Sequence, residues 1–429
     1  MTSTASGAGR RVVTRTALAG LIGLCVAVGA ATPSATAAPR LSARAAILFA
    51  PATQQTLYAA NAYRAGAIAS TTKLMTALVV LDHIHRLGTV FTEPHYYPAA
   101  VDSQIGLVPG ERVTVHDLLL ALMLPSADDA AENLAYNIGR GPGHWSLNRA
   151  VGRFVAMMNA RARSLGLRHT HYSTPIGLDT PGNYSTASDL VRLAAYDLGH
   201  SRFFARIVGL GQAALHSGNQ VRYVLNRNDL VRRYGWIHGV KTGHTAAAGY
   251  VLVASGHRSG MTLISAVLGT SSEASRDANA LALLDYGFGH YRLAAAVRVG
   301  QVLARPTVRY RDREHASLVA ASTLRRVLTR GSTVRVRVHA PAQLTGPLPR
   351  HAVEGRVVVL VNGRPVARVP LLLAKALPAV SPLTVAVTFI AQPLMLALIF
   401  FLLAGAVALA LHLRQRRRPR AGERGLEPA

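Results

Sequence analysis

Lysine is nearly absent from this chain of 429 residues. Lys73, Lys241 and Lys375 are the only lysines among 47 Lys and Arg residues. Arginine stays protonated in proteins, so almost none of these basic side chains can give up a proton and act as a base. A position that keeps lysine is therefore a candidate for proton transfer, and Lys73 follows Ser70 by three residues.

Cysteine, metal-binding spacings and phosphate loops are scarce or missing as well. The single cysteine, Cys25, lies in the leading apolar run, so we expect no disulfide and no thiol chemistry in the mature protein. The sequence has no Cys/His metal spacing, no Gly-rich phosphate loop and no repeat of 20 to 50 residues. We therefore predict neither a cofactor nor a metal.

Acidic residues are also few: 20 Asp and Glu stand against 47 Lys and Arg, which gives a formal net charge of +27. Such a chain favours anionic surfaces, and for an exported protein these are lipid headgroups or acidic wall polymers. Nucleic acid is not an expected partner.

Both ends of the chain resemble targeting or membrane segments. Three arginines precede the apolar run 17–31, and small residues at 35–37 supply a cleavage site, so residues 1–37 are predicted to be a signal peptide. The pair Arg10-Arg11 leaves the general and the twin-arginine export routes open.

No Asp, Glu, Lys or Arg occurs between Lys375 and Arg414, and about 20 apolar residues suffice to span a bilayer. We predict a transmembrane helix over 383–413. The basic tail 414–429 is then cytoplasmic by the positive-inside rule, and the rest of the mature chain lies outside. The alternative, a buried core helix, does not explain the arginine cluster that follows the run.

Between the two ends the pattern changes once, near residue 297. Residues 40–292 mix strands and helices, whereas 297–375 alternate Val and Arg, with Asn362-Gly363 as a hairpin turn. In the first region we expect a hairpin over 44–59, helices over 67–82, 115–124, 126–136, 145–165 and 272–288, a further helix beginning at 185–189, and strands over 239–245, 249–255 and 261–268. The prediction is an α+β domain followed by a small all-β domain.

Ser70 and Lys73 are three residues apart in the predicted helix 67–82, so their side chains are neighbours on one face. A lysine amine that loses its proton can then take the proton of the serine hydroxyl and make it a nucleophile. The alternative is that Ser70 caps the helix and Lys73 is a solvated residue of its first turn.

Two further triplets follow in order: Ser126-Ala-Asp128 in a loop between helices, and Lys241-Thr242-Gly243 entering a strand. With the Ser70 motif they resemble the three motifs of penicillin-binding proteins and serine β-lactamases. The chain is most similar to D-alanyl-D-alanine carboxypeptidases, the low-molecular-mass penicillin-binding proteins of serine peptidase family S11. That resemblance extends over about residues 40 to 375 and includes segments 122–131, 175–179, 184–190 and 239–250.

The resemblance implies a β-lactamase/transpeptidase-like domain, with an antiparallel sheet and a helical subdomain, followed by a β-sandwich. It implies Ser70 as nucleophile, Lys73 as base, and Ser126 as the relay that protonates the leaving D-alanine. Lys241 and Thr242 would hold the terminal carboxylate. The backbone N–H groups of Ser70 and His244 would form the oxyanion hole.

The implied partners are peptidoglycan stem peptides, β-lactam antibiotics and membrane lipids. The implied activity removes the terminal D-alanine from pentapeptide stems, on the outer side of a bacterial cell membrane, in the synthesis of the wall that sets cell shape.

Three features depart from the family pattern. Asp128 stands where Asn is usual, and a carboxylate there stabilises the ammonium form of Lys73. Thr262 stands where many relatives have Arg, so carboxylate recognition is expected to depend on Thr242 or Arg258. The usual anchor is an amphipathic helix, whereas this chain has an apolar span.

Two alternatives remain from the sequence. A serine β-lactamase needs a carboxylate base for fast deacylation, and the Glu-x-x-Leu-Asn motif is missing: Ser146-Leu147-Asn148 lacks the glutamate. A non-catalytic wall-binding protein is compatible with Asp128 and with the β domain.

Overall fold

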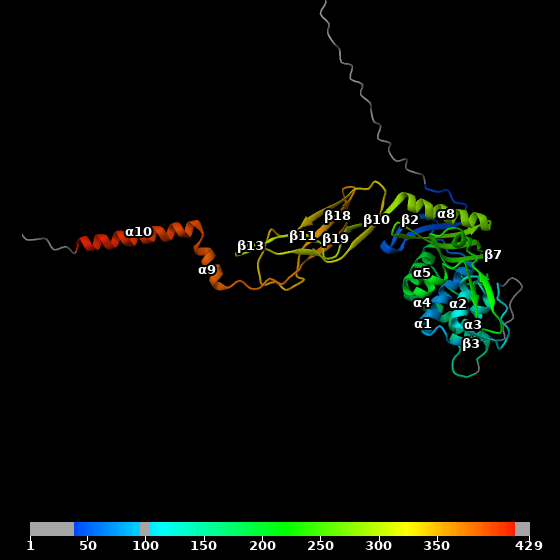
Figure 1. Cartoon of the computed structure of the whole chain (residues 1–429). Coiled ribbons are helices and arrows are strands. Elements are labelled where there is room, and N and C mark those ends of the chain that lie inside the picture. Colours follow the sequence, from blue (N-terminus) through cyan, green and yellow to red (C-terminus); the bar gives the residue numbers. More distant parts are fainter. Residues whose placement is uncertain (1–37, 95–102, 144, 417–429) are drawn as a thin grey trace, which may run out of the picture. The chain divides into compact units, whose positions relative to one another are not determined.

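The structure is a computed structural model that describes residues 38–94, 103–143 and 145–416 (Figure 1). The predicted signal peptide, with Cys25, and all but the first residues of the predicted tail lie outside the described residues.

A five-stranded antiparallel sheet in the order β2-β1-β9-β8-β7 is the centre of the first domain. Its strands are β1 (Ala45–Ala50), β2 (Gln55–Ala60), β7 (Ile237–Thr245), β8 (Gly249–Arg258) and β9 (Met261–Thr270). The first hairpin of the chain thus joins strands that follow about two hundred residues later, because β1 pairs with β9 from Ala45, opposite Leu268, to Phe49, opposite Ile264.

Each face of this sheet is covered by helices, as expected for strands that are apolar on both sides. On one face Ile47, Val253 and Ala266 belong to the main hydrophobic core, which includes α5. On the other face Leu48 and Leu252 pack into a second core with α8 (Figure 1). The alternation follows from the two-residue period of a strand.

The helices of this domain are α1 (Lys73–His83), α2 (Val115–Met123), α3 (Asp128–Gly139), α4 (Leu147–Ser164), α5 (Ala187–His200), α6 (Arg202–Ile207), α7 (Asp229–Arg233) and α8 (Glu273–His290). The smaller elements are the 3-10 helices η1 (Pro51–Thr53) and η2 (Ala69–Thr72), and the paired strands β3 (Val90–Thr92) with β4 (Arg112–Thr114) and β5 (Gln212–Leu215) with β6 (Arg222–Leu225).

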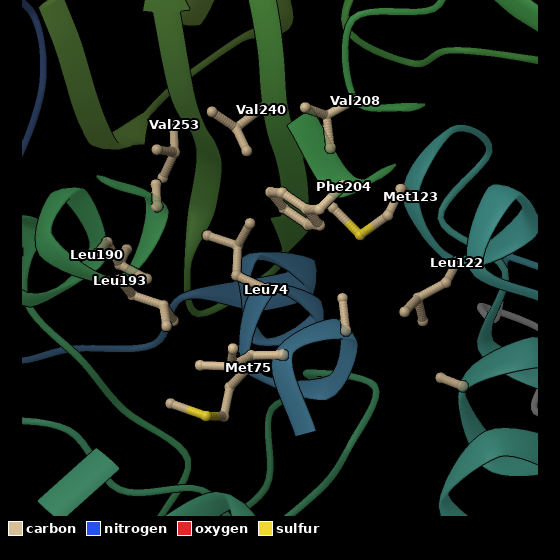
Figure 2. Packing of buried hydrophobic residues seen from close by; sticks show 14 of the residues in the cluster. Leu74, Met75, Leu122, Met123, Leu190, Leu193, Phe204, Val208, Val240 and Val253 are labelled. Atoms are coloured by element: carbon tan, nitrogen blue, oxygen red, sulfur yellow. The ribbon is translucent and has the colours of Figure 1, made fainter. Parts of the chain in front are cut away.

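Helix α1 is deeply buried, and eight consecutive residues from Lys73 to Val80 are buried. Figure 2 shows Leu74 and Met75 of α1 within reach of apolar side chains from other helices and from strands β7 and β8. A helix fixed by packing all round holds its start rigidly, and with it Lys73, its first residue, and Ser70 in the preceding 3-10 helix η2.

The second domain consists of strands. They are β10 (Tyr291–Val297), β11 (Val302–Ala304), β12 (Thr307–Val308), β13 (Arg311–His315), β14 (Leu318–Ala320), β15 (Leu324–Thr329), β16 (Val334–His339), β17 (Gln343–Leu344), β18 (Val353–Val361) and β19 (Arg364–Leu373). Five of them form a sheet in the order β11-β14-β19-β18-β16, and β13-β12-β17 form another. The predicted turn at Asn362-Gly363 joins β18 and β19, with φ of 49° and 80°.

The structure corrects several predicted boundaries. The predicted helix 67–82 begins as the 3-10 helix η2, and the helix predicted from residue 145 begins at Leu147. Thr186, and not Ser185, caps α5, because its side chain accepts a hydrogen bond from the Asp189 N–H. Strands predicted to end at 255 and 268 extend to Arg258 and Thr270, and β8 and β9 are joined by the two-residue turn Ser259-Gly260, with φ of 50° and 73°.

The predicted membrane helix is two helices, α9 (Pro382–Ile390) and α10 (Pro393–Arg416). Pro393 has no N–H to donate into a preceding turn, so a new helix begins there. By length and composition α10 is able to cross a membrane, and none of its residues is buried in the protein.

Candidate active site

Ser70 lies in the 3-10 turn that leads into α1, and Lys73 is the first residue of α1. The amine Nζ of Lys73 lies 3.0 Å from the hydroxyl Oγ of Ser70. Ala69, immediately before the serine, has a φ of 48°, in the left-handed region that costs energy for a residue with a side chain. The packed surroundings therefore hold the nucleophile in a conformation that a free chain would avoid.

Lys73 is completely buried, and its ammonium group meets three acceptors. These are Ser70 Oγ, the Ile176 carbonyl at 2.8 Å, and the carboxylate of Asp128, with which it forms a close ion pair. These acceptors stabilise the charged amine. The structure therefore excludes the alternative of a solvated Lys73 in an exposed first turn.

Ser126 lies in the connection between α2 and α3, as the sequence predicts. Its φ is 70°, and it is buried. Among the described residues its hydroxyl has no hydrogen-bond partner. A buried hydroxyl without a partner is costly, and such a group at a cavity wall suits a role that is fulfilled only when a ligand is present.

Strand β7 supplies the third motif. Lys241 is buried, and its amine donates to the Thr242 carbonyl at 3.1 Å. Burial, and then the charges of Lys73 and Arg227, hold the pKa of Lys241 well below its usual value. An anion bound in the adjoining cavity would favour the charged form of this amine.

Gly243 is the point of closest approach between β7 and the serine turn. A Cβ at this position would lie 2.8 Å from the Ser70 backbone N and 2.9 Å from the Cβ of Ala69. Only glycine lets the strand come so near. The next residue, His244, is exposed and stacks on Tyr250 with 3.9 Å between ring centroids.

We therefore expect Gly243→Ala to slow acylation of Ser70 by at least about tenfold, because the added methyl pushes the strand away from the serine amide. The measurement is the rate of labelling by a fluorescent penicillin. Gly235→Ala is the matched control, since a Cβ there meets nothing within 4 Å. Equal rates for the two variants would show that the contact has no catalytic importance.

The loop 175–183 packs against the serine turn, helix α1 and the end of β7. Its Pro175 carbonyl accepts from the Thr76 hydroxyl at 2.6 Å, next to the Ile176 carbonyl that Lys73 contacts. Asp179 accepts from the Thr245 hydroxyl at 2.6 Å and from the Ala247 N–H at 2.9 Å. The loop thus ties α1 to the end of β7.

These elements border a cavity of about 500 Å³. Ser70, Ser126, Thr242, Gly243 and His244 line it together. The cavity is not lined by Lys73, Lys241 or Asp128, which lie behind the lining residues. The other lining residues are Ser103, Leu225, Asn226, Arg227, Asp229, Arg232, Tyr250, Glu273 and Arg276.

Arg276 is a lining residue that the sequence did not reveal. It lies in the first turn of α8, is 2% exposed, and pairs with Glu273 and Asp277 at 2.8 Å each. A buried guanidinium at a cavity wall is a strong candidate for binding a carboxylate. No sequence signal separated it from 43 other arginines.

The suggestion that Arg258 binds the substrate carboxylate is wrong. Arg258 pairs with Asp285 at 3.0 Å and lies over the Trp236 ring, 3.6 Å from its centroid. It borders a different cavity, at the end of β8 remote from Tyr250. Thr262 also lies at that end, hydrogen-bonded to His257 at 2.9 Å.

Within the described ranges, no group of three or more His, Cys, Asp or Glu is placed to hold a metal ion. A serine hydroxyl beside a buried lysine, a second serine, and cations at the wall are the parts of a serine acyl-transfer site.

Known proteins agree with that class. The family described as D-alanyl-D-alanine carboxypeptidase, Peptidase S11, matches residues 32–272. A D-alanyl-D-alanine carboxypeptidase of Streptomyces sp. (strain K15) is 33% identical over 271 residues, which cover 61% of this chain and 92% of that protein. D-alanyl-D-alanine carboxypeptidase DacC of Escherichia coli (strain K12) is 30% identical over 354 residues, which cover 78% of this chain and 84% of that protein.

The fold agrees as well. The crystal structure of penicillin binding protein 5 from Haemophilus influenzae superposes with a TM-score of 0.64 at 27% identity, over 79% of this chain and 98% of that one. The chain belongs to the D-alanyl-D-alanine carboxypeptidase family of serine peptidases, and the predicted family and fold class are confirmed.

Proposed function

We propose that this protein is a serine D-alanyl-D-alanine carboxypeptidase that removes the terminal D-alanine from peptidoglycan stem pentapeptides through an acyl-enzyme on Ser70. The observation that carries the proposal is the pair of Ser70 Oγ, at the wall of the cavity, and Lys73 Nζ, buried 3.0 Å behind it. Penicillins would acylate the same serine.

In the acylation step Ser70 Oγ attacks the carbonyl carbon of the penultimate D-alanine, and its proton passes to Lys73 Nζ, which has to be in its neutral amine form to accept it. The C–N bond to the last D-alanine then breaks, and Ser126 relays a proton to the departing amine. Water later hydrolyses the ester. The unpartnered Ser126 hydroxyl supports this role, since a bound leaving group supplies the missing partner.

The terminal carboxylate of the substrate would be held by Thr242 and Arg276, with the charge of Lys241 behind them. Thr242 and Arg276 line the cavity. The backbone N–H groups of Ser70 and His244 would form the oxyanion hole, which the close approach at Gly243 supports.

The test is release of D-alanine from a purified pentapeptide muropeptide, followed alongside labelling by fluorescent penicillin. We expect release of D-alanine, and we expect the penicillin to form a stoichiometric, covalent adduct with the protein. A protein that binds muropeptide without labelling would be a non-catalytic wall-binding homologue, and a rapidly hydrolysed adduct would identify a β-lactamase. Adding an amine acceptor separates hydrolysis from transfer, which matters because a 33% identical structure is titled a DD-transpeptidase.

Asp128 is expected to restrain the base. Asp128→Asn keeps an oxygen for Lys73 but removes the carboxylate that stabilises its ammonium form. We expect acylation at neutral pH to become faster by about tenfold or more. A tenfold increase corresponds to a barrier lower by about 1.4 kcal/mol. The measurement is the penicillin acylation rate from acidic to basic pH.

The same substitution has a structural side effect that needs a control. The second carboxylate oxygen of Asp128 accepts the Ser103 N–H at 3.0 Å, and an amide nitrogen there does not. The melting temperature of the Asn variant should therefore be compared with that of the natural protein. A well-folded Asn variant with slower acylation at every pH would show that Asp128 assists catalysis.

We also propose that residues 1–37 direct export and that α10 anchors the enzyme, with its active site on the outer side of the cell membrane. Basic residues at the end of α10, Arg414 and Arg416, support this orientation.

Truncation after Lys375 tests the anchor. Among the described residues beyond Leu373 none is buried, and Leu377 packs partly buried on the core of the second domain, so the shortened protein is expected to fold, label with penicillin and appear in the soluble fraction. Recovery of active truncated protein in the membrane pellet after a high-salt wash would place the attachment elsewhere.

A further inference from the structure

One face of the five-stranded sheet of the second domain carries a cluster of cations. Arg335 and Arg337 of β16 lie opposite Leu360 and Val358 of β18, and Val358 in turn lies opposite Arg368 of β19. Residues directly opposite in an antiparallel pair point to the same face.

The same register places His339 of β16 opposite Arg356 of β18. The other face of β18 contributes Val357 and Val359 to the domain core, and both are fully buried. The basic face, defined by Arg335, Arg337, His339, Arg356 and Arg368, is therefore the outer face of the sheet, and all five side chains are exposed.

These charges are not neutralised within the domain. Residues 297–375 contain fifteen Arg and Lys but only three acidic residues, Asp312, Glu314 and Glu354. None of the four arginines of the basic face forms an ion pair with a described residue, and Glu314 is paired with Arg311.

Protection of a sheet edge does not explain the pattern. Charged residues on an edge strand prevent it from pairing with another chain, and β16 is an edge strand. Arg356 and Arg368, however, lie on β18 and β19, which have neighbours on both sides. The cluster continues across the sheet and therefore suits a flat anionic partner.

We propose that the basic face binds the anionic phospholipid headgroups of the membrane that α10 enters. Guanidinium groups bind phosphates with two parallel hydrogen bonds, and their aliphatic stems pack on apolar neighbours such as Val358 and Leu360. Basic side chains near an anionic surface are attracted to it over about a Debye length, so the attraction depends on salt.

The tether favours lipid over a soluble wall polymer. Only 19 residues separate Leu373, the end of β19, from Pro393, the start of α10. A short tether keeps the domain near the bilayer and gives its headgroups a high effective concentration. This inference rests on the proposed membrane anchor.

The experiment uses the full mature chain in nanodiscs, either of phosphatidylcholine alone or mixed with phosphatidylglycerol. Coelution with the discs tests the anchor, independently of the basic face. Phenylglyoxal then modifies exposed arginines, and mass spectrometry gives the rate at each position. We expect Arg335, Arg337, Arg356 and Arg368 to react several-fold more slowly in anionic discs, with the protection lost at high salt.

Three exposed arginines of the first domain, Arg112, Arg163 and Arg192, are the internal control and should react equally in both discs. Equal rates at the basic face in both kinds of disc would overturn the inference. So would protection by poly(glycerol phosphate) in zwitterionic discs without protection by anionic lipid, which would identify a wall polymer as the partner.

A second readout allows variants to be compared. Lys375 is the only one of the three lysines that is not buried, so an amine-reactive dye placed there reports distance to a headgroup-labelled lipid by energy transfer. We expect greater transfer in anionic discs for the natural chain but not for R335Q/R337Q/R356Q/R368Q. The charge-matched control R112Q/R163Q/R192Q/R202Q should behave as the natural chain, and both should still label with penicillin. Equal transfer in all three proteins would contradict the proposal.

Discussion

Replacing Ser70 by alanine is expected to abolish both penicillin labelling and D-alanine release. Alanine lacks the oxygen that forms the ester, and Ser70 Oγ is the hydroxyl that lies 3.0 Å from the Lys73 amine. Loss of a nucleophile removes the covalent route, which is worth several orders of magnitude in rate. The measurement is covalent labelling followed by mass spectrometry of the active-site peptide.

Ser126→Ala is the informative comparison for this variant. It removes the proton relay but leaves the nucleophile and its base. We therefore expect penicillin to label the Ser126→Ala variant slowly, whereas the Ser70→Ala variant is not labelled. The backbone at Ser70 does not depend on its side chain, and the turn stays buried through Ala69, Thr71 and Thr72. The melting temperature of Ser70→Ala should therefore be nearly that of the natural protein. Stoichiometric labelling of the folded Ser70→Ala variant would place the nucleophile elsewhere.

The second large effect is expected for Lys73→Arg. A guanidinium keeps the positive charge and can still pair with Asp128, but it cannot serve as a base. Lys73 is 0% exposed, so the longer side chain also has to displace its neighbours. We expect acylation to fall by at least about a thousandfold, roughly 4 kcal/mol of barrier.

Overpacking and loss of the base can be separated in this experiment. The melting temperature reports the packing change, whereas the acylation rate of the folded fraction reports the chemistry. Lys73→Met removes the charge with less bulk, and it should be as inactive as the arginine variant. Acylation of the folded Lys73→Arg variant within about tenfold of the natural rate would show that Lys73 is only structural.

Local sequence alone determined the parts of this protein that depend on neighbouring residues. The spacing of Ser70 and Lys73 fixes them on one turn, because a helix brings residues three apart together. Asn362-Gly363 fixes a hairpin, because both residues accept positive φ, and the charge-free run before Arg414 fixes a helix long enough to span a bilayer. The order of the three motifs was sufficient to predict the family, which the comparisons confirm.

The tertiary structure decided what depends on distant segments. The acceptor for Lys73 at Ile176 is 103 residues away, and the approach of Gly243 to Ser70 joins a strand to a turn that precedes it by more than 170 residues. Arg276 and Arg258 look alike in the sequence, yet one lines the cavity and the other stacks on Trp236 at a remote strand end. Side-chain chemistry is encoded residue by residue, but which charge reaches a cavity is set by strand register and by the packing of α8, which no local pattern specifies.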